Sequence, residues 1–506
     1  MSGKDATPPL EIELKLLFPP DARPLLAQHL ASMSMGQGRQ EHLITTYYDS
    51  HDLALGNAGL SLRVRHVGQQ RIQTLKATTK GNGLASHRAE WERVVKSDQP
   101  DLNVLSGTPA GPLLAALNGK LMPVWGSDVH RTTYTFQHDG ATVEAAIDEG
   151  CIRAGEAQDM VRELELELKE GPVTALYSLA LRLQAAVPLR LGMLTKTERG
   201  YHLLTGMPAS SRQIDIPRLT KKTTLAEGFG MLVRAGVNTL IHNQPAAEAG
   251  DPEGIHQMRV AIRQLRTMLQ MLKDHAARPT LDLFQSELQR IGHKLGEARD
   301  WDVLCLETLP AAFATQGDGD LIGLFNDSAT EKRMNAHQQL CQELETPALT
   351  ELMLSLMLWV EDRSFPGDGT QRAASLSHVA PVVLNRLARK VRRRGRHIHQ
   401  LSSDERHALR KSLKKLRYGA QYFAGLHASR SVKTYMKRSK KLLRHLGEIN
   451  DATVADTLVS TLGKTHPGLA VVAGTFADWN DKRRRKALHA LPAAWKKFRN
   501  AEPFWH

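Results

Sequence analysis

Three segments of the chain alternate charged and apolar residues with a period of two, which is typical of half-buried β-strands. These segments are residues 11–16, 59–65 and 163–169. Their polar faces carry Glu11, Glu13 and Lys15, then Arg63 and Arg65, and finally Glu163, Glu165 and Glu167. Several strands that carry complementary charges on one face predict a β-barrel with a polar interior.

The spacing of these charges also indicates a chemistry. Carboxylates two residues apart on a strand can hold a hard divalent cation through oxygen ligands. Arginines and lysines at the same spacing can hold the phosphate oxygens that such a cation also contacts. For any single one of these residues, a salt bridge on a solvated strand face is the alternative.

The remainder of the chain divides by the period of its apolar residues. Residues 10–205 read as strands with a few helices, and residues 130–136 and 142–148 are expected to form a hairpin across an Asp-Gly turn. Residues 206–222 carry prolines, serines and paired lysines and are predicted to be a linker. Beyond this linker the period changes to 3.6, which predicts about eight helical segments. The expected fold class is therefore α+β, with an all-α C-terminal domain.

The helical half contains an internal repeat. Residues 256–266 recur as residues 407–417, and residues 295–300 recur as residues 446–451. The interval is 151 residues in both cases, which predicts two duplicated four-helix units.

Each repeat carries a stripe of basic residues. Histidine, arginine, arginine or lysine, and arginine follow at i, i+3, i+7 and i+10, within an arc of about 80° on a helix. The two stripes are His256, Arg259, Arg263 and Arg266, and His407, Arg410, Lys414 and Arg417. A solvated face usually mixes both signs of charge, because like charges repel. Two purely basic stripes therefore favour a polyanionic ligand.

The overall charge distribution supports this interpretation. Residues 1–210 carry 21 Lys and Arg against 23 Asp and Glu, a net charge of −2, whereas residues 211–506 carry 46 against 30, a net charge of +16. Nucleic acid, an anionic membrane surface and polyphosphate are all compatible partners. The basic runs at residues 392–394 and 482–486 lack interleaved aromatic residues and a base-reading motif, so nucleic acid is disfavoured as the main partner.

Cysteine usage and the N-terminus indicate the compartment. Cys151, Cys305 and Cys341 are scattered without metal-ligand spacing, which is typical of reduced thiols in a cytoplasmic protein. Residues 1–9 show no apolar core of a signal peptide. The most apolar run, residues 352–360, is too short to span a bilayer. We therefore expect a cytoplasmic protein without membrane partners.

The Glu-x-Glu-x-Lys segment at residues 11–15, with the later Arg-x-Arg and Glu-x-Glu strands, resembles the signature of the CYTH superfamily of triphosphate tunnel metalloenzymes. The resemblance implies a closed antiparallel barrel of about eight strands that binds a triphosphate together with Mg²⁺ or Mn²⁺. The metal ligands that it implies are Glu11, Glu13, Asp148, Glu165 and Glu167. The triphosphate-binding residues that it implies are Lys15, Arg63, Arg65, Lys76, Arg131, Lys196 and Arg199.

Two choices within this site depend on local sequence. Glu163 shares a face with Glu165, but residues 169–171 end this strand as the late strand of the CYTH family ends, so the resemblance implies Glu165 and Glu167 as the ligand pair. Glu90 and Glu92 are the candidate catalytic carboxylates that activate water, as an alternative to activation by the metal itself. A Ser/His/Asp or Cys/His set is not evident in the sequence, which favours direct attack by water.

The two basic stripes resemble those of the CHAD domain, the conserved histidine α-helical domain. That resemblance implies binding of inorganic polyphosphate by the stripes. The predicted organisation is a CYTH domain at residues 1–205, a linker at 206–222 and a CHAD domain at 223–506, with repeat units at about 223–365 and 374–506.

The sequence thus predicts hydrolysis of inorganic triphosphate to diphosphate and phosphate, with a polyphosphate-binding domain attached. A nucleotide or thiamine triphosphatase, a class IV-like adenylate cyclase, and a non-enzymatic polyphosphate-binding or granule-targeting protein are the alternatives. The number of carboxylates favours catalysis, because binding of an anion alone needs mainly the basic residues. Sequence leaves open the preferred metal, the oligomeric state and any coupling between the domains.

Overall fold

The computed structural model describes residues 11–34, 36–77, 86–213, 215–314, 319–362, 373–464 and 467–505. It divides into two compact units. The first comprises Met1–Ser210 and Glu345–Asp362, and the second comprises Ser211–Leu344 and Arg363–His506. The α+β class is confirmed, with an antiparallel sheet in the N-terminal part of the chain and helices in the C-terminal part.

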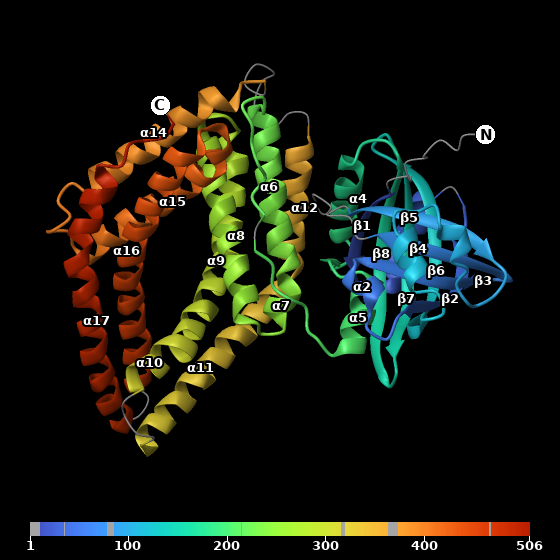
Figure 1. Ribbon diagram of the computed structural model, residues 1–506, viewed down its shortest axis with the longest axis horizontal. Coiled ribbons are helices and arrows are strands. Elements are labelled where there is room, and N and C mark those ends of the chain that lie inside the picture. Colours follow the sequence, from blue (N-terminus) through green and yellow to red (C-terminus); the bar gives the residue numbers. More distant parts are fainter. Residues whose placement is uncertain are drawn as a thin grey trace. The chain divides into compact units, whose positions relative to one another are not determined.

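The first unit is built on one antiparallel sheet (Figure 1). Its strands are β1 (Glu11–Leu17), β2 (Arg39–Asp49), β3 (Leu60–Val67), β4 (Gln70–Ala77), β5 (Ser86–Val95), β6 (Met122–His138), β7 (Ala141–Ala154), β8 (Ala157–Glu170) and β9 (Arg190–Leu191). Their order is β5-β4-β3-β2-β6-β7-β8-β1-β9. In addition, β1 pairs with β5, with Glu11 opposite Arg88 and Glu13 opposite Ser86.

The predicted hairpin of β6 and β7 is confirmed. Asp139 and Gly140 connect the two strands with φ angles of 45° and 74°. Positive φ at both central residues is what a type I′ turn requires, and Asp-Gly is among the sequences that adopt it most readily.

Strands next to the polar interior are buried on both faces, which explains their charged and apolar alternation. On β8, Leu164 and Leu166 are fully buried, and so is Glu163, which precedes Leu164 and lies on the opposite face of the strand. The helices of this unit are α1 (Arg23–Met33), α2 (Ala54–Asn57), α3 (Gly111–Ala116), α4 (Thr174–Gln184), α5 (Lys196–Thr205) and α12 (Pro347–Glu361), with a 3-10 turn at Asn103–Leu105. An apolar cluster of Leu62 and Leu75 with Leu105 and Leu114 shows how short helical segments cover the apolar face of β3 and β4.

Helix α5 is held tightly against the sheet. Thr195 and Glu198 form a reciprocal capping box that defines its first turn. Gly200 lies against the Trp125 ring, where an added Cβ would come within 2.4 Å of the ring atoms. Trp125 in turn stacks on Tyr47, with ring centroids 3.5 Å apart. This packing fixes the position from which Lys196 and Arg199 project.

Helix α12 belongs to the first unit although the sequence analysis placed it in the helical domain. It packs against α4 and β9. The backbone N–H of Leu191 donates a hydrogen bond to Thr350 Oγ1 at 3.1 Å, and Gln184 Nε2 donates one to the carbonyl of Pro347 at 3.0 Å. Residues 352–360 are apolar around most of the helix, and Leu352, Met353, Leu354, Leu356 and Met357 among them are buried.

The second unit is helical throughout its described elements. They are α6 (Leu225–His242), α7 (Gln244–Glu248), α8 (Pro252–Met271), α9 (Arg278–Val303), α10 (Leu309–Phe313), α11 (Asp320–Glu345), α14 (Leu376–Arg394), α15 (Ser403–Tyr422), α16 (Ser429–Gly463) and α17 (Pro467–Arg499). The 3-10 turns Leu272–Asp274 and Phe423–Leu426 follow α8 and α15, and a π-helical turn, Leu304–Thr308, follows α9.

The starts of these helices follow the sequence repeat. The interval of 151 residues that separates the repeated motifs also separates the starts of α6 and α14, of α8 and α15, and of α9 and α16. Helices α8 and α15 are both 20 residues long, and each is followed by a 3-10 turn.

Candidate functional site

A cavity of about 210 Å³ lies on the polar face of the sheet. Strands β1 to β6, strand β8 and the start of α5 contribute its walls. The lining residues are Glu13, Lys15, Tyr47, Arg63, Arg65, Lys76, Glu90, Glu92, Arg131, Glu165, Thr195, Lys196 and Thr197. Ten of them are residues that the sequence analysis assigned to the site, contributed by strands far apart in the chain.

Three carboxylates converge at one side of this cavity. Each of Asp148, Glu163 and Glu165 contributes a carboxylate oxygen to a group whose atoms lie within 4.8 Å of one another. The register explains the proximity, because Asp148 on β7 is directly opposite Glu163 on β8. Asp148 and Glu163 are completely buried.

Cationic side chains interleave with these carboxylates. Lys196 Nζ lies 2.8 Å from Asp148, 2.6 Å from Glu163 and 2.9 Å from Glu165. Arg131 contacts both oxygens of Asp148 at 2.7 and 2.6 Å and Glu165 at 2.5 Å. The ammonium group of Lys15 lies 3.3 Å from Glu163 and 3.4 Å from Glu165.

These cations keep the carboxylates ionised. Burial alone would raise the pKa of Glu163, but Lys15 and Lys196 lower that pKa to about 2. Burial opposes ionisation of Glu165 as well, and Lys196 and Arg131 hold its pKa well below the ordinary value. Both groups are therefore anionic at neutral pH, as ligands of a hard cation must be.

A second charged cluster occupies the wall formed by β3, β4 and β5. Lys76 Nζ lies 2.6 Å from Glu90, and Arg63 lies 3.5 Å from the same carboxylate. Glu92 is half exposed and accepts a hydrogen bond from the Thr74 hydroxyl at 2.9 Å. Burial and the neighbouring charge of Arg63 lower the pKa of Arg65 to about 10, which is evidence of crowded positive charge.

The remaining predicted residues lie in different surroundings. Glu11 is in β1, but its side chain lies outside the described part of the structure. Glu167 contacts Lys169 at 2.6 Å and lies opposite Glu144 on β7. Arg199 contacts Glu163 at 2.8 Å and Asp159 at 2.7 Å.

Glu163 is the residue whose position the sequence analysis missed. It meets Asp148 and Glu165, whereas Glu167 makes its ion pair with the partly exposed Lys169. The period of two places all three glutamates on one face, but only the register with β7 distinguishes their depth along the strand.

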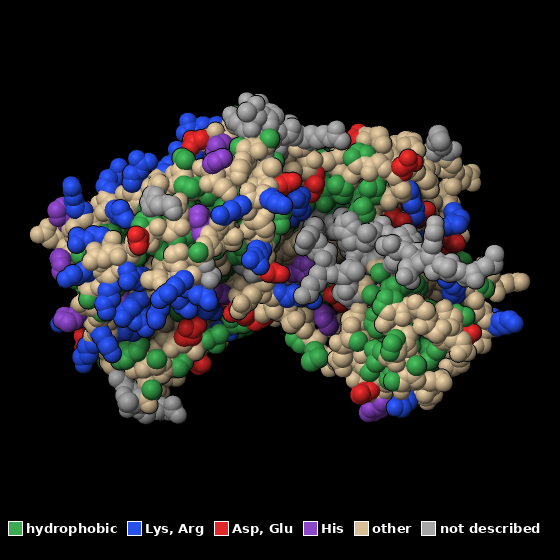
Figure 2. All heavy atoms as spheres, turned by 45° about the horizontal axis from the view of Figure 1, so that its top comes forward, with side chains coloured by type: hydrophobic (Ala, Val, Ile, Leu, Met, Phe, Trp, Pro, Cys, Tyr) green, Lys and Arg blue, Asp and Glu red, His purple; other side chains and the backbone are tan. Residues whose placement is uncertain are grey.

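In the second unit, the two basic stripes approach each other. Burial and the positive charges of Arg263, Arg410 and Arg259 lower the pKa of Lys414 to about 6. Arg263 and Arg259 belong to the first stripe, and Arg410 and Lys414 belong to the second. Figure 2 shows many Lys and Arg side chains gathered on the visible surface of this unit.

The second repeated motif positions an arginine of each stripe. Arg259 contacts Asp300 at 2.8 Å, and the equivalent Arg410 contacts Asp451 at 3.5 Å. His407 hydrogen-bonds through Nδ1 to Asn450 Oδ1 at 2.6 Å. Asp300 and Asp451 thus each form an ion pair with one arginine of a stripe. The sequence analysis did not assign this role to them.

Part of the hydrogen-bonding capacity of the stripes is unused within the protein. The Nε atoms of Arg263, Arg410 and Arg417 are buried and lack a hydrogen-bond partner among the described residues. Burial of a donor without a partner costs free energy.

Within the described ranges, each helix is too short or too polar to cross a lipid bilayer.

Family models match both parts of the chain. The CYTH domain model matches residues 9–201, and the CHAD domain model matches residues 232–460. The inorganic triphosphatase of Haemophilus influenzae is 30% identical over 194 residues, which are 38% of this chain and 54% of that protein. The chain therefore aligns with about half the length of this relative.

Solved structures are similar to each part. The crystal structure of the CHAD domain from the plant Ricinus communis has 25% sequence identity and a TM-score of 0.51, and covers 58% of this chain and 98% of that one. A Hippeastrum protein named as an adenylyl cyclase with a dominant triphosphatase activity has 20% identity and a TM-score of 0.29, and covers 38% of this chain and 95% of that one.

Proposed function

Because the chain consists of a CYTH domain followed by a CHAD domain, we propose that it hydrolyses inorganic triphosphate to diphosphate and phosphate and binds inorganic polyphosphate through its helical unit. The observation that carries the proposal is the cavity in which ionised, buried carboxylates face a set of Lys and Arg side chains. Carboxylate oxygens that can bind a cation therefore lie next to Lys and Arg side chains that can donate hydrogen bonds to phosphate oxygens.

The strand pairing supports a closed tunnel. Strand β1 follows β8 in the order that begins with β5, and its first residues pair in addition with β5, so the two strands at the ends of the eight-strand run meet. A tunnel would admit an extended anion and exclude most of the solvent that otherwise screens the charges around it.

Asp148, Glu163 and Glu165 would hold a divalent cation, Mg²⁺ or Mn²⁺, in this tunnel. They fit such an ion because their oxygens converge, Glu163 and Glu165 are anionic, and Asp148 and Glu163 are fully buried. Glu11, Glu13 and Glu167 remain proposed ligands from the same strand faces. When bound, the cation neutralises phosphate oxygens and stabilises charge that develops on the leaving group.

The basic residues would bind the triphosphate. In the structure, Lys15, Arg131 and Lys196 form ion pairs with the carboxylates Asp148, Glu163 and Glu165. When a divalent cation and a triphosphate bind together, the carboxylates would pair with the cation instead. The three basic side chains would then pair with the phosphate oxygens. The residues of the proposed phosphate contacts are Lys15, Arg63, Arg65, Lys76, Arg131, Lys196 and Arg199. Crowding of positive charge around Arg65 supports this role, since an anion would relieve the repulsion.

Between the two candidate bases, the contacts favour Glu92. Glu90 pairs with Lys76 at 2.6 Å and with Arg63 at 3.5 Å, whereas Glu92 lies 4.0 Å from Arg63, is half exposed and accepts a hydrogen bond from Thr74. The more accessible carboxylate is better placed to take a proton from an attacking water.

The size of the cavity favours an inorganic substrate. Its volume of about 210 Å³ is below the roughly 300–1,000 Å³ of sites that enclose drug-sized ligands. A nucleotide or thiamine triphosphate would have to leave its organic part outside. The Haemophilus influenzae relative, named an inorganic triphosphatase, supports the same choice.

For the helical unit, we infer two duplicated four-helix units that together present one polyphosphate site. The equal spacing of the helix starts and the equivalent ion pairs Arg259–Asp300 and Arg410–Asp451 support the duplication. The depressed pKa of Lys414 supports a site in which positive charge from both stripes accumulates before a ligand arrives.

A substrate panel tests the proposed activity. Phosphate release from inorganic triphosphate, ATP and thiamine triphosphate is measured with Mg²⁺, with Mn²⁺ and with a chelator. We expect metal-dependent release that is fastest with inorganic triphosphate. Faster release from ATP or thiamine triphosphate, or formation of cyclic AMP, would replace the inorganic substrate with one of the alternatives. An absence of turnover with every substrate would favour a protein that only binds.

A further inference from the structure

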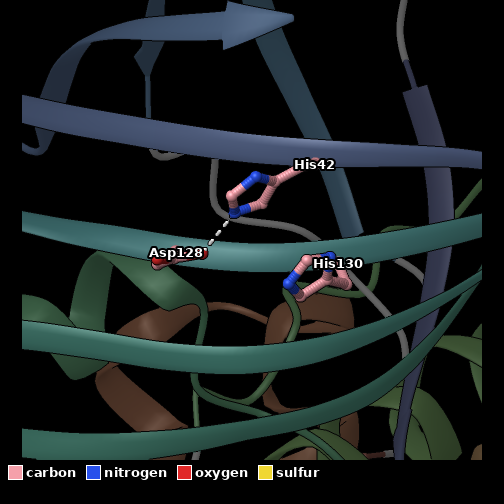
Figure 3. A group of neighbouring side chains, drawn as sticks. All are labelled: His42, Asp128 and His130. Carbon is pink, nitrogen blue, oxygen red and sulfur yellow. Dashed lines mark hydrogen bonds and ion pairs between the residues drawn. The ribbon is translucent and has the colours of Figure 1, made fainter.

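Two histidines and an aspartate lie together on the outer face of the sheet, away from the tunnel. His42 on β2 is directly opposite His130 on β6, and Asp128 is two residues before His130. Their chain neighbours Leu43 and Val129 are buried on the other face of these strands. Figure 3 shows the three side chains gathered at the β2–β6 pair.

The three side chains are close enough to share a ligand. His42 Nε2 lies 2.7 Å from Asp128 Oδ1. The rings of His42 and His130 stack, with centroids 4.4 Å apart and planes inclined by 6°. One ligand atom of each residue falls within a group whose members lie within 4.8 Å of one another.

The surroundings leave this cluster open to solvent and to an ion. The side chains of His42 and Asp128 are 46% and 43% exposed. Glu149, which is directly opposite His130 on β7, is ion-paired with Arg23. A hydrogen bond between His42 and Asp128 would account for two of the residues, but it gives no role to the parallel ring of His130.

We propose that His42, Asp128 and His130 form a binding site for a divalent transition-metal ion of the Zn²⁺ type, separate from the tunnel. Two imidazole nitrogens and one carboxylate are a common ligand set for zinc, with water in the fourth position. Imidazole ligands select Zn²⁺, Cu²⁺ or Ni²⁺, whereas a site made of carboxylate oxygens suits Mg²⁺ and Mn²⁺. The two sites therefore differ in the class of metal that they prefer.

Only a small movement is needed to assemble the site. Tetrahedral coordination at Zn–N distances of 2.0–2.1 Å places two nitrogens about 3.3 Å apart. The ligand atoms are at most 4.8 Å apart, so rotation of partly exposed side chains can bring them together. The bound ion would cross-link β2 to β6 on the face opposite Arg131, and should stabilise the folded state in proportion to its occupancy.

The test uses the full chain in excess Mg²⁺, which occupies the tunnel, and titrates Zn²⁺ alone by calorimetry and thermal unfolding. We expect one zinc site that raises the Tm. His42→Gln, His130→Gln and Asp128→Asn should each weaken this site more than about tenfold, since even residues that only support metal ligands contribute about 10- to 100-fold. His51→Gln, which changes an exposed histidine elsewhere on the same unit, is the matched control and should leave zinc affinity unchanged.

Mg²⁺-dependent triphosphate hydrolysis is expected to persist in each variant, and it shows that the variant is folded. Loss of zinc binding with hydrolysis retained concerns the zinc site alone. Absence of hydrolysis in the wild-type chain would instead contradict the proposed function of the tunnel. Wild-type zinc affinity in both histidine variants would overturn the proposal. Should a variant fail to fold, copper-catalysed oxidation of the wild-type chain locates the site by peptide mass spectrometry. Oxidation of His42 and His130 with His51 spared supports the site, and oxidation at neither residue overturns it.

Discussion

At the scale of single residues, the depth of a carboxylate along its strand decides its role. Glu163 and Glu165 lie among Lys15, Lys196 and Asp148, whereas Glu167 pairs with Lys169 near the end of the strand. The first two would therefore contact a metal ion and substrate more directly than the third.

We predict that Glu165→Gln reduces metal-dependent phosphate release at least about 100-fold, the magnitude typical of losing one preorganised electrostatic group. Glu163→Gln should be comparably severe, whereas Glu167→Gln should cost less than about tenfold. Initial rates across a Mg²⁺ titration, with circular dichroism to monitor folding, check the ranking. Equal losses at all three positions would restore Glu167 to the ligand set, and an unaffected Glu165→Gln variant would remove the metal site from this group.

Lys414 gives a second prediction at this scale. With a pKa of about 6, it is largely neutral at pH 7 in the free protein. A bound polyanion favours the charged form and raises this pKa, so binding takes up a proton between pH 6 and the higher pKa of the complex. Polyphosphate affinity should therefore fall as the pH rises above 6, by up to tenfold per pH unit.

Calorimetry in buffers of different ionisation enthalpy measures this proton uptake. Lys414→Arg keeps the charge at every accessible pH and should abolish the pH dependence that Lys414 causes. Lys411→Arg, at an exposed position on the same helix, is the control and should retain it. Proton uptake that is the same in the Lys414→Arg variant would place the titrating group elsewhere.

At the scale of elements, the period of the sequence predicts faces well and partners poorly. The alternation at residues 11–16 correctly predicted a strand with Lys15 turned toward other charges. The same alternation carries no information about register, so it could not distinguish Glu163 from Glu167 or reveal that His42 lies opposite His130. The first depends on the register between the consecutive strands β7 and β8, and the second on pairing between β2 and β6, which are far apart in sequence.

Helix α12 shows the same limit for helices. Its apolar run predicts burial, but a helix that is apolar around most of its surface does not indicate what buries it. In the structure it packs on α4, and Thr350 accepts a hydrogen bond from the Leu191 backbone. A residue more than 150 positions downstream thus completes the packing of the first unit.

We therefore predict that Thr350→Val destabilises the first unit by about 1–3 kcal/mol, because a buried N–H group loses its acceptor. Thr350→Ser keeps the hydroxyl and should cost less. Denaturant unfolding followed through triphosphate hydrolysis reports on this unit. Equal stability of the two variants would mean that the Leu191–Thr350 bond contributes little, and residues 1–205 would then be expected to fold and hydrolyse triphosphate as an independent fragment.

At the scale of the whole molecule, charge distinguishes the two parts of the chain. Residues 1–210 carry a net charge of −2, whereas residues 211–506 carry a net charge of +16. Like charges that converge from two helices are stable only if the fold holds them together or a ligand compensates them. The ion pairs of Asp300 and Asp451 neutralise one arginine in each stripe, and Arg266 donates hydrogen bonds to the neutral side chains of Gln285 and Gln289 and so keeps its charge uncompensated within the described part of the chain.

The basic stripes should therefore dominate binding of long polyphosphate by the full chain. Each stripe spans about 15 Å at 1.5 Å per residue, enough to contact several consecutive phosphates. Such contacts release counterions, so affinity should fall steeply with salt.

Reversing the charge of Arg259 and Arg263, or of Arg410 and Lys414, should weaken binding and flatten the salt dependence. The pair Lys482→Glu and Lys486→Glu, at exposed positions on α17, makes the same change in net charge and should have a smaller effect. His256→Ala should also cost less, because burial and Arg299 lower the pKa of His256 and a neutral imidazole offers only a hydrogen bond.

Competition with duplex DNA at physiological ionic strength separates a specific site from general charge attraction. Displacement of polyphosphate by DNA at equal phosphate concentration would identify nucleic acid as the partner, and equal losses in the stripe and α17 variants would mean that net charge alone drives binding.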